Sequence, residues 1–93
     1  MNFTDKIALV TGGGNGIGRA SALRFAELGA AVVVVDNDAT AAADTARRIT
    51  EQGGDALDVA ADVSRSDQVQ AYVAATVHKH GRIDCFFNNP GIE

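Results

Sequence analysis

Residues 11–18 read Thr-Gly-Gly-Gly-Asn-Gly-Ile-Gly, and this stretch determines how the rest of the chain is interpreted. An apolar run, residues 7–10, precedes it, and a stretch with helical periodicity, residues 19–28, follows it. Strand, glycine-rich turn and helix, in this order, form the context that a phosphate-binding loop requires. The free N–H groups at a helix start bind anions, and glycines allow a pyrophosphate to approach the backbone. We therefore interpret the stretch as a phosphate-binding loop, the alternative being a plain surface turn.

The spacing of the glycines narrows this interpretation. The common fingerprint G-x-G-x-x-G, counted from Gly12, would need a glycine where Ile17 stands. The pattern that fits is T-G-x-x-x-G-I-G, with glycines at Gly12, Gly16 and Gly18. Asn15 interrupts the glycines of the turn, and asparagine tolerates left-handed backbone angles better than most residues. In this form the loop resembles the cofactor loop of the short-chain dehydrogenase/reductase family.

Composition restricts the class of protein. The 93 residues fit one small domain, residues 1–93, with a net charge of -4. No basic cluster exceeds the pair Arg47-Arg48, which argues against nucleic acid as a partner. The single cysteine excludes an internal disulfide and suits a reducing cytoplasm. No signal peptide is recognisable, and no apolar run approaches the ~20 residues that span a membrane. We expect a cytoplasmic protein without membrane partners.

Hydrophobic periodicity predicts strands and helices in alternation. The expected strands lie at residues 6–11, 31–35, 56–61 and 83–87, and the expected helices at 16–28, 39–52 and 66–80. Right-handed crossovers then give a βαβαβαβ chain with the strand order 3-2-1-4. The predicted fold class is α/β, a partial three-layer Rossmann-like parallel sheet. The carboxyl ends of its strands would form one edge, where ligands bind in such folds.

Helical spacing also predicts where side chains lie. The second helix is expected to have Asp38 as its N-cap. We expect Arg19, just after the loop, to be solvated, with a phosphate contact as the alternative. The inner stripe of the second helix is expected to consist of Ala39, Ala42, Ala43, Ala46 and Ile49.

Asp36 indicates which cofactor the loop would serve. It ends the second predicted strand, eighteen residues after Gly18, where an acid that binds the adenosine ribose is expected. A carboxylate there accepts hydrogen bonds from the 2′- and 3′-hydroxyls and repels a 2′-phosphate. Asn15, Asn37 and Asp38 supply no positive charge for that phosphate. The sequence therefore predicts NAD in preference to NADP, unless Asp36 merely ends a strand.

The family resemblance covers essentially the whole chain and implies further contacts. Asp62 would bond the adenine amino group and Val63 would flank the ring; the alternative is a turn in which Ser64 or Ser66 caps the next helix. The segment 88–91, Asn-Asn-Pro-Gly, resembles the family's Asn-Asn-Ala-Gly element, and its Pro90 lacks the N–H of the alanine. The implied cofactor-binding residues are Gly12, Gly14, Asn15, Gly16, Ile17, Gly18, Asp36, Asp62, Val63, Asn88, Pro90 and Gly91.

The resemblance implies an oxidoreductase that moves hydride between the nicotinamide and a small-molecule alcohol or carbonyl substrate. Catalysis in the family uses a Tyr-x-x-x-Lys pair, but the only tyrosine, Tyr72, is followed by Thr76 at the lysine position. We therefore predict no catalytic residue here, and we interpret the chain as the first part of a longer, homo-oligomeric enzyme, inactive on its own. The open fourth strand predicts that the isolated chain associates or is only partly ordered.

Two other functions stay open at this point. A non-catalytic nucleotide-binding or interaction module would equally lack the Tyr-x-x-x-Lys pair. The second alternative is a small Rossmann-like protein that binds S-adenosylmethionine, although the G-x-x-x-G-I-G spacing argues against it. No metal site is predicted, because His78 and His80 do not share a helix face. Cys85 is expected to be a structural thiol within the fourth strand.

Overall fold

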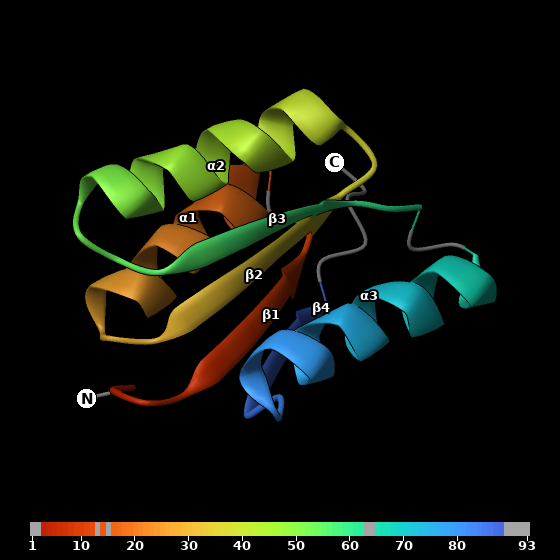
Figure 1. Cartoon of the computed structure of the whole chain (residues 1–93). Helices are drawn as coiled ribbons and strands as arrows, with labels where there is room; N and C mark the ends of the chain where they lie inside the picture. The colour runs from red at the N-terminus through yellow and green to blue at the C-terminus, as the bar shows by residue number, and fades with distance from the viewer. Residues whose placement is uncertain (1–2, 13, 15, 63–64, 89–93) are drawn as a thin grey trace.

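The computed structural model describes residues 3–12, 14, 16–62 and 65–88. Strands and helices alternate along the chain, as the sequence predicts (Figure 1). The helices begin or end within one residue of their predicted bounds. The elements are β1 (Ile7–Thr11), α1 (Gly16–Glu27), β2 (Ala31–Asp36), α2 (Ala39–Glu51), β3 (Ala56–Ala60), α3 (Ser66–His80) and β4 (Cys85–Asn88).

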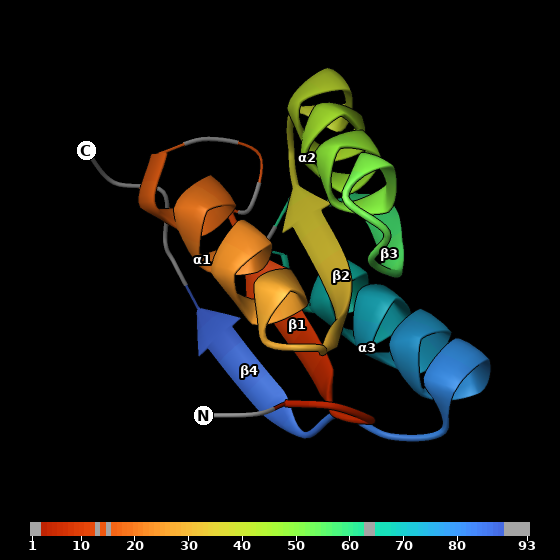
Figure 2. The same ribbon diagram turned by 90° about the vertical axis from the view of Figure 1, so that its left-hand side faces the viewer.

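The four strands form one parallel sheet in the order β3-β2-β1-β4. Helices α1 and α2 cover one face of this sheet and α3 covers the other (Figures 1 and 2). The predicted three-layer arrangement and strand order are thereby confirmed. In the register, Thr11 lies opposite both Val35 and Asn88, and Asp36 lies opposite Ala60. The last residues of all four strands therefore lie along one edge, which we call the carboxyl edge.

The core divides into two layers because side chains alternate along each strand. Val32 and Val34 of β2 pack toward α1 and α2, where Ile49 joins them. Val33 and Val35 pack on the opposite face, where Tyr72 of α3 covers them. A parallel strand covered on both faces is apolar throughout, and all four of these valines are fully buried.

The inner stripe predicted for α2 is wrong at two positions. Ala39 and Ala43 are exposed, whereas Ala41 and Thr45 are buried beside the correctly predicted Ala42, Ala46 and Ile49. Alanine is small enough for either face, so an alanine-rich helix does not reveal its inner side by hydrophobicity. The predicted N-cap is confirmed, because Asp38 Oδ1 accepts a hydrogen bond from the Ala41 N–H at 3.1 Å.

Strand β4 begins two residues later than predicted, because Asp84 uses its side chain where a strand would use its backbone. Asp84 Oδ2 accepts a hydrogen bond from the Ile7 N–H at 2.8 Å, while the Asp84 N–H donates to the Ile7 carbonyl at 2.9 Å. The Ile7 N–H, together with the Arg82 guanidinium, holds the pKa of Asp84 below its ordinary value. This double contact fixes β4 in register with β1.

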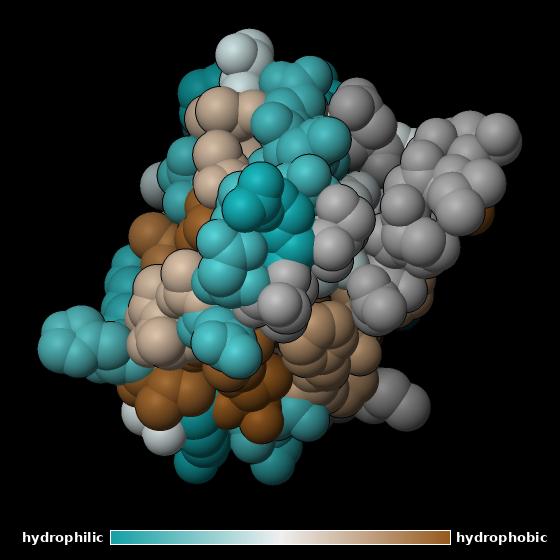
Figure 3. All heavy atoms as spheres, turned by 90° about the vertical axis from the view of Figure 1, so that its right-hand side faces the viewer, coloured by the Kyte–Doolittle hydropathy of each residue, from teal (hydrophilic) through white to brown (hydrophobic). Residues whose placement is uncertain are grey.

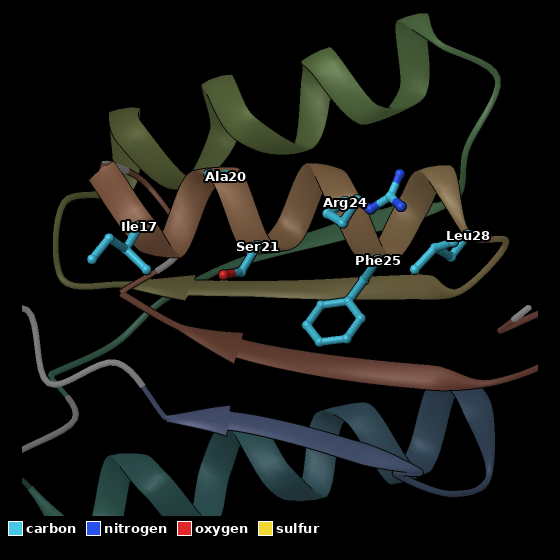
Figure 4. A pocket seen from close by; sticks show the side chains of 6 residues that line it. All are labelled: Ile17, Ala20, Ser21, Arg24, Phe25 and Leu28. Atoms are coloured by element: carbon cyan, nitrogen blue, oxygen red, sulfur yellow. The ribbon is translucent and has the colours of Figure 1, made fainter. Parts of the chain in front are cut away.

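Apolar side chains stay uncovered beside β4. The strand pairs with β1, and Phe86 is 49% exposed. On the other face, Ile17, Phe25 and Leu28 help to line a groove of about 320 Å³ along α1 (Figure 4). The ring of Phe25 lies 6.5 Å from that of Phe87, so one side chain that lines the groove also contacts β4. Association of the isolated chain through these surfaces stays a prediction.

Candidate functional site

The carboxyl edge collects the predicted cofactor residues from separate parts of the sequence. The glycine turn follows β1, Asp36 ends β2, Asp62 follows β3 and Asn88 ends β4. Figure 3 looks onto this edge, where a band of hydrophilic side chains crosses the surface. The fold therefore brings these segments together as the sequence predicts. Four of the predicted residues lie outside the described part of the chain: Asn15, Val63, Pro90 and Gly91.

The glycine turn leads directly from β1 into α1. Gly12 has a φ of 66° and Gly16 a φ of 56°, left-handed angles that glycine adopts without strain. Helix α1 begins at Gly16, so its free N–H groups and positive dipole end face the carboxyl edge. Gly18 is buried within α1, whereas Ile17 is 73% exposed and projects toward the groove on the side of the helix (Figure 4).

Gly14 is buried between the end of β2 and the start of α2. A Cβ atom at this position would lie 2.6 Å from Ala41 Cβ and 2.8 Å from Asp36 Oδ2, and real Cβ atoms do not approach other atoms so closely. The Gly14 N–H donates a hydrogen bond to Asp36 Oδ2 at 3.0 Å. Only glycine allows the turn to pass so close to Ala41 and Asp36. The hydrogen bond then fixes the loop and the Asp36 carboxylate relative to each other.

The Asp36 carboxylate is held in place but keeps capacity to accept further hydrogen bonds. Its Oδ2 accepts from Gly14, and its Oδ1 accepts from the Asp38 N–H at 3.0 Å. Each carboxylate oxygen has two lone pairs, so one acceptor position on each oxygen is left. Both donors are neutral backbone groups, and the Asp36 side chain is half-buried at the carboxyl edge. Such a carboxylate can accept two hydroxyl donors on neighbouring carbons.

Asp62 is held at the start of α3 through its backbone. Its N–H donates to Gln68 Oε1 at 2.5 Å, and its carbonyl accepts from the Arg65 N–H at 3.1 Å. The N-cap position of α3 is Arg65, which makes no side-chain capping bond. Ser64 and the side chain of Ser66, the two alternative capping groups, lie outside the described part of the chain.

The expectation that Arg19 is a solvated residue is wrong. Its Nε donates a hydrogen bond to Thr45 Oγ1 at 3.0 Å, and its Nη2 lies 3.0 Å from Asp44 Oδ2. The Arg19 side chain is 23% exposed, because α1 and α2 lie side by side (Figure 2). A contact between two helices leaves no pattern within either one, so the sequence gives no sign of it. Thr45, which no sequence motif marks, is thereby also a neighbour of the loop, because its hydroxyl contacts the Gly14 carbonyl.

The described residues offer neither a catalytic tyrosine nor a metal site. Tyr72 is 2% exposed in the core beside Leu9 and Val33, and burial raises its pKa. Cys85 lies half-buried against the core, in keeping with a structural thiol. Within the described residues, no three acidic, histidine or cysteine side chains gather to hold a metal ion. No helix among them is long and apolar enough to cross a membrane.

Comparison with known sequences places this chain beside a family of oxidoreductases. Residues 6–93 match the family model described as short chain dehydrogenase. The chain is 48% identical to levodione reductase of Leifsonia aquatica, an alignment that covers 98% of this chain and 35% of that protein. It is 43% identical to the short-chain dehydrogenase/reductase homolog YusS of Bacillus subtilis (strain 168), covering 99% of this chain and 85% of YusS. The chain thus spans about a third of the first relative and most of the second.

Solved structures show the same fold in longer chains. A hydroxysteroid dehydrogenase from Escherichia coli superposes with a TM-score of 0.93 at 35% identity, over 95% of this chain and 37% of that one. A 7α-hydroxysteroid dehydrogenase complexed with NADH and 7-oxo glycochenodeoxycholic acid gives a TM-score of 0.89 at 34% identity, over 91% and 33%. A metagenomic short-chain oxidoreductase in complex with NADP gives 0.86 at 36% identity, over 90% and 38%.

Proposed function

Because this chain belongs to the short-chain dehydrogenase family, we propose that it is the cofactor-binding part of an oxidoreductase that uses NAD. One observation carries the proposal. The Gly14 N–H donates to the Asp36 carboxylate, so the glycine turn and the acid are joined at the edge where α1 begins. An anion-binding helix start next to a fixed carboxylate suits a ligand that has a phosphate next to a ribose with two free hydroxyls.

In this proposal, each group of residues at the carboxyl edge binds a different part of the cofactor. The turn from Gly12 to Gly18 binds the pyrophosphate, with Gly14, Asn15, Gly16 and Ile17 between these two. Asp36 binds the adenosine ribose. The remaining contacts are proposed from the family resemblance alone: Asp62 and Val63 would bind the adenine, and Asn88, in one segment with Pro90 and Gly91, would contact the cofactor ribose region.

The preference for NAD over NADP rests on charge. The free acceptor positions of Asp36 match the 2′- and 3′-hydroxyls of NAD, whereas the 2′-phosphate of NADP would place negative charge against a carboxylate. Asn37 and Asp38, which follow Asp36, offer no positive charge in compensation. Related structures hold NADH in one case and NADP in another, so the family alone does not decide the cofactor. The local residues of this chain favour NAD.

For the whole protein we propose hydride transfer between the nicotinamide and a small alcohol or carbonyl compound. Relatives with this fold include reductases and dehydrogenases, of which this chain spans about a third. Residues 1–93 contain no Tyr-x-x-x-Lys pair, and Tyr72 is buried in the core. We therefore assign cofactor binding to this chain, as the first part of a larger Rossmann domain, and no proton transfer.

A second candidate is a nucleotide-binding module without catalysis of its own. The likeness to YusS favours this candidate. This chain spans 85% of YusS, so a relative that is only slightly longer than this chain exists. Both candidates bind the cofactor through the same edge, and an oxidoreductase assay on the full-length product of the gene, rather than on this chain alone, distinguishes them.

Calorimetric titration of the purified chain with NAD, NADP and S-adenosylmethionine tests the proposal. We expect NAD to bind, NADP to bind at least about tenfold more weakly because of the charge at Asp36, and S-adenosylmethionine not to bind. Equal affinities for NAD and NADP would refute the assignment of Asp36. Binding of S-adenosylmethionine alone would refute the proposed function.

A further inference from the structure

Thr45 of α2 is a buried hydroxyl that contacts the glycine loop. Its side chain has no exposed surface and lies between α1, α2 and the turn. Its Oγ1 donates a hydrogen bond to the Gly14 carbonyl at 3.4 Å and accepts one from Arg19 Nε at 3.0 Å. Residues from two helices and the turn thus meet at one oxygen atom.

The direction of this hydroxyl differs from that of two other helical threonines, Thr50 and Thr76. A helical threonine commonly donates to the carbonyl four residues earlier. Thr50 does so toward Ala46 at 3.0 Å, and Thr76 toward Tyr72 at 2.8 Å. Thr45 donates instead across to the loop. Because a hydroxyl has one proton and Arg19 supplies a donor of its own, the Thr45 proton is left for the Gly14 carbonyl.

Arg19 is itself fixed in this position. Its guanidinium pairs with Asp44, one residue before Thr45, and the two side chains are 23% and 26% exposed. Asp44 also pairs with Arg47 and Arg48, whose hydrogen bonds hold its pKa below the ordinary value. The ion pair therefore keeps the Arg19 guanidinium on α2, where its Nε can direct the hydroxyl.

We propose that Thr45 is a positioning residue for the phosphate-binding loop and that Arg19 orients its hydroxyl. The Gly14 peptide is then held at both ends, its carbonyl by Thr45 and its N–H by Asp36. The loop is fixed before any ligand arrives, so less conformational entropy is lost on binding. The consequence for NAD affinity rests on the proposed function, whereas the fixation of Gly14 does not.

Amide hydrogen exchange of Gly14 in the ligand-free chain tests the fixation directly. Thr45→Val keeps the shape and removes the hydroxyl, and we expect Gly14 to exchange about tenfold faster than in the wild type. Thr45→Ser restores the hydroxyl and should restore the protection. Thr50→Val is the matched control on the same helix, because its hydroxyl bonds only within α2. The Val33 amide in the central strand β2 reports any general loss of stability.

NAD affinity, measured on the same variants, tests the consequence. We expect Thr45→Val to bind NAD about tenfold more weakly, and both Thr45→Ser and Thr50→Val to bind within about twofold of the wild type. If Gly14 exchange responds as expected but no variant binds NAD, the proposed function fails and the positioning role of Thr45 stands. If Thr45→Val behaves like Thr50→Val in both measurements, the positioning role is refuted.

Arg19→Gln provides a second variant should Thr45→Val fail to fold. It removes the Nε donor at a partly exposed position and frees the Thr45 hydroxyl to turn back into its own helix. We expect Gly14 exchange to accelerate by several-fold, less than in Thr45→Val. Unchanged exchange in Arg19→Gln would refute the orienting role of Arg19.

Discussion

Replacing Gly14 by alanine is expected to abolish measurable NAD binding and to destabilise the chain by about 1–3 kcal/mol. The added Cβ would lie 2.6 Å from Ala41 Cβ, 2.8 Å from Asp36 Oδ2 and 3.0 Å from the Ala41 backbone carbon. Ala41 is buried in α2, so the loop must move away, and the hydrogen bond from Gly14 to Asp36 breaks. Calorimetry with NAD and denaturant unfolding measure the two effects.

Gly53→Ala is the control for the loss of stability. Gly53 lies beyond the end of α2, and a Cβ there meets nothing within 4 Å, but its φ of 88° makes alanine strained by roughly 1–2 kcal/mol. The two variants should therefore lose similar stability, while Gly53→Ala keeps the NAD affinity of the wild type. Gly14→Ala binding NAD as tightly as Gly53→Ala would contradict the role of the loop.

Asp36→Ala is expected to weaken NAD binding by about 10- to 100-fold, as the loss of hydrogen bonds to a charged group predicts. It removes the proposed acceptor for the ribose hydroxyls and also the acceptor for the Gly14 and Asp38 N–H groups. NADP affinity should fall less, or rise, because the repulsion of the 2′-phosphate disappears. Titration with both cofactors should then show that the dissociation constant of NADP divided by that of NAD is smaller than in the wild type.

Asp38→Asn controls for charge near the same edge. Asp38 caps α2 through its Oδ1, and asparagine is an equally good N-cap, so stability should be preserved. The variant removes one negative charge two residues from Asp36 but no proposed ribose contact. We expect the ratio of NAD to NADP affinity to stay as in the wild type. An equal change of the ratio in both variants would assign the preference to general negative charge.

The fold could be predicted from the sequence because the strands are recognisable from their own apolar residues. The valines of β2 form an uninterrupted apolar run, which is typical of a parallel strand covered on both faces. The alternation of strands with helices then leaves few arrangements, and the order β3-β2-β1-β4 is among them. The residues that end each strand follow from this order, so the edge on which Asp36 and the glycine turn meet was predictable as well.

The contacts between helices were not predictable in this way. Arg19 and Thr45 are 26 residues apart, and neither lies in a sequence pattern that predicts a contact with the other. A buried threonine on an alanine-rich helix looks like a surface residue, because hydrophobicity marks apolar faces and misses polar groups that find partners inside. The start of β4 was misplaced for a related reason, since the Asp84 side chain replaces a backbone group in pairing with Ile7.

Chemical-shift mapping of NAD on the isotope-labelled chain tests the central claim most directly. If the carboxyl edge binds the dinucleotide, the amide signals of Gly14, Gly16 and Asp36 should shift with added NAD and saturate together. Those of Gly53 and Gly81, which follow the carboxyl ends of α2 and α3 away from this edge, should stay in place. Saturable shifts confined to the groove along α1, or no shifts at all in a folded chain, would contradict the account.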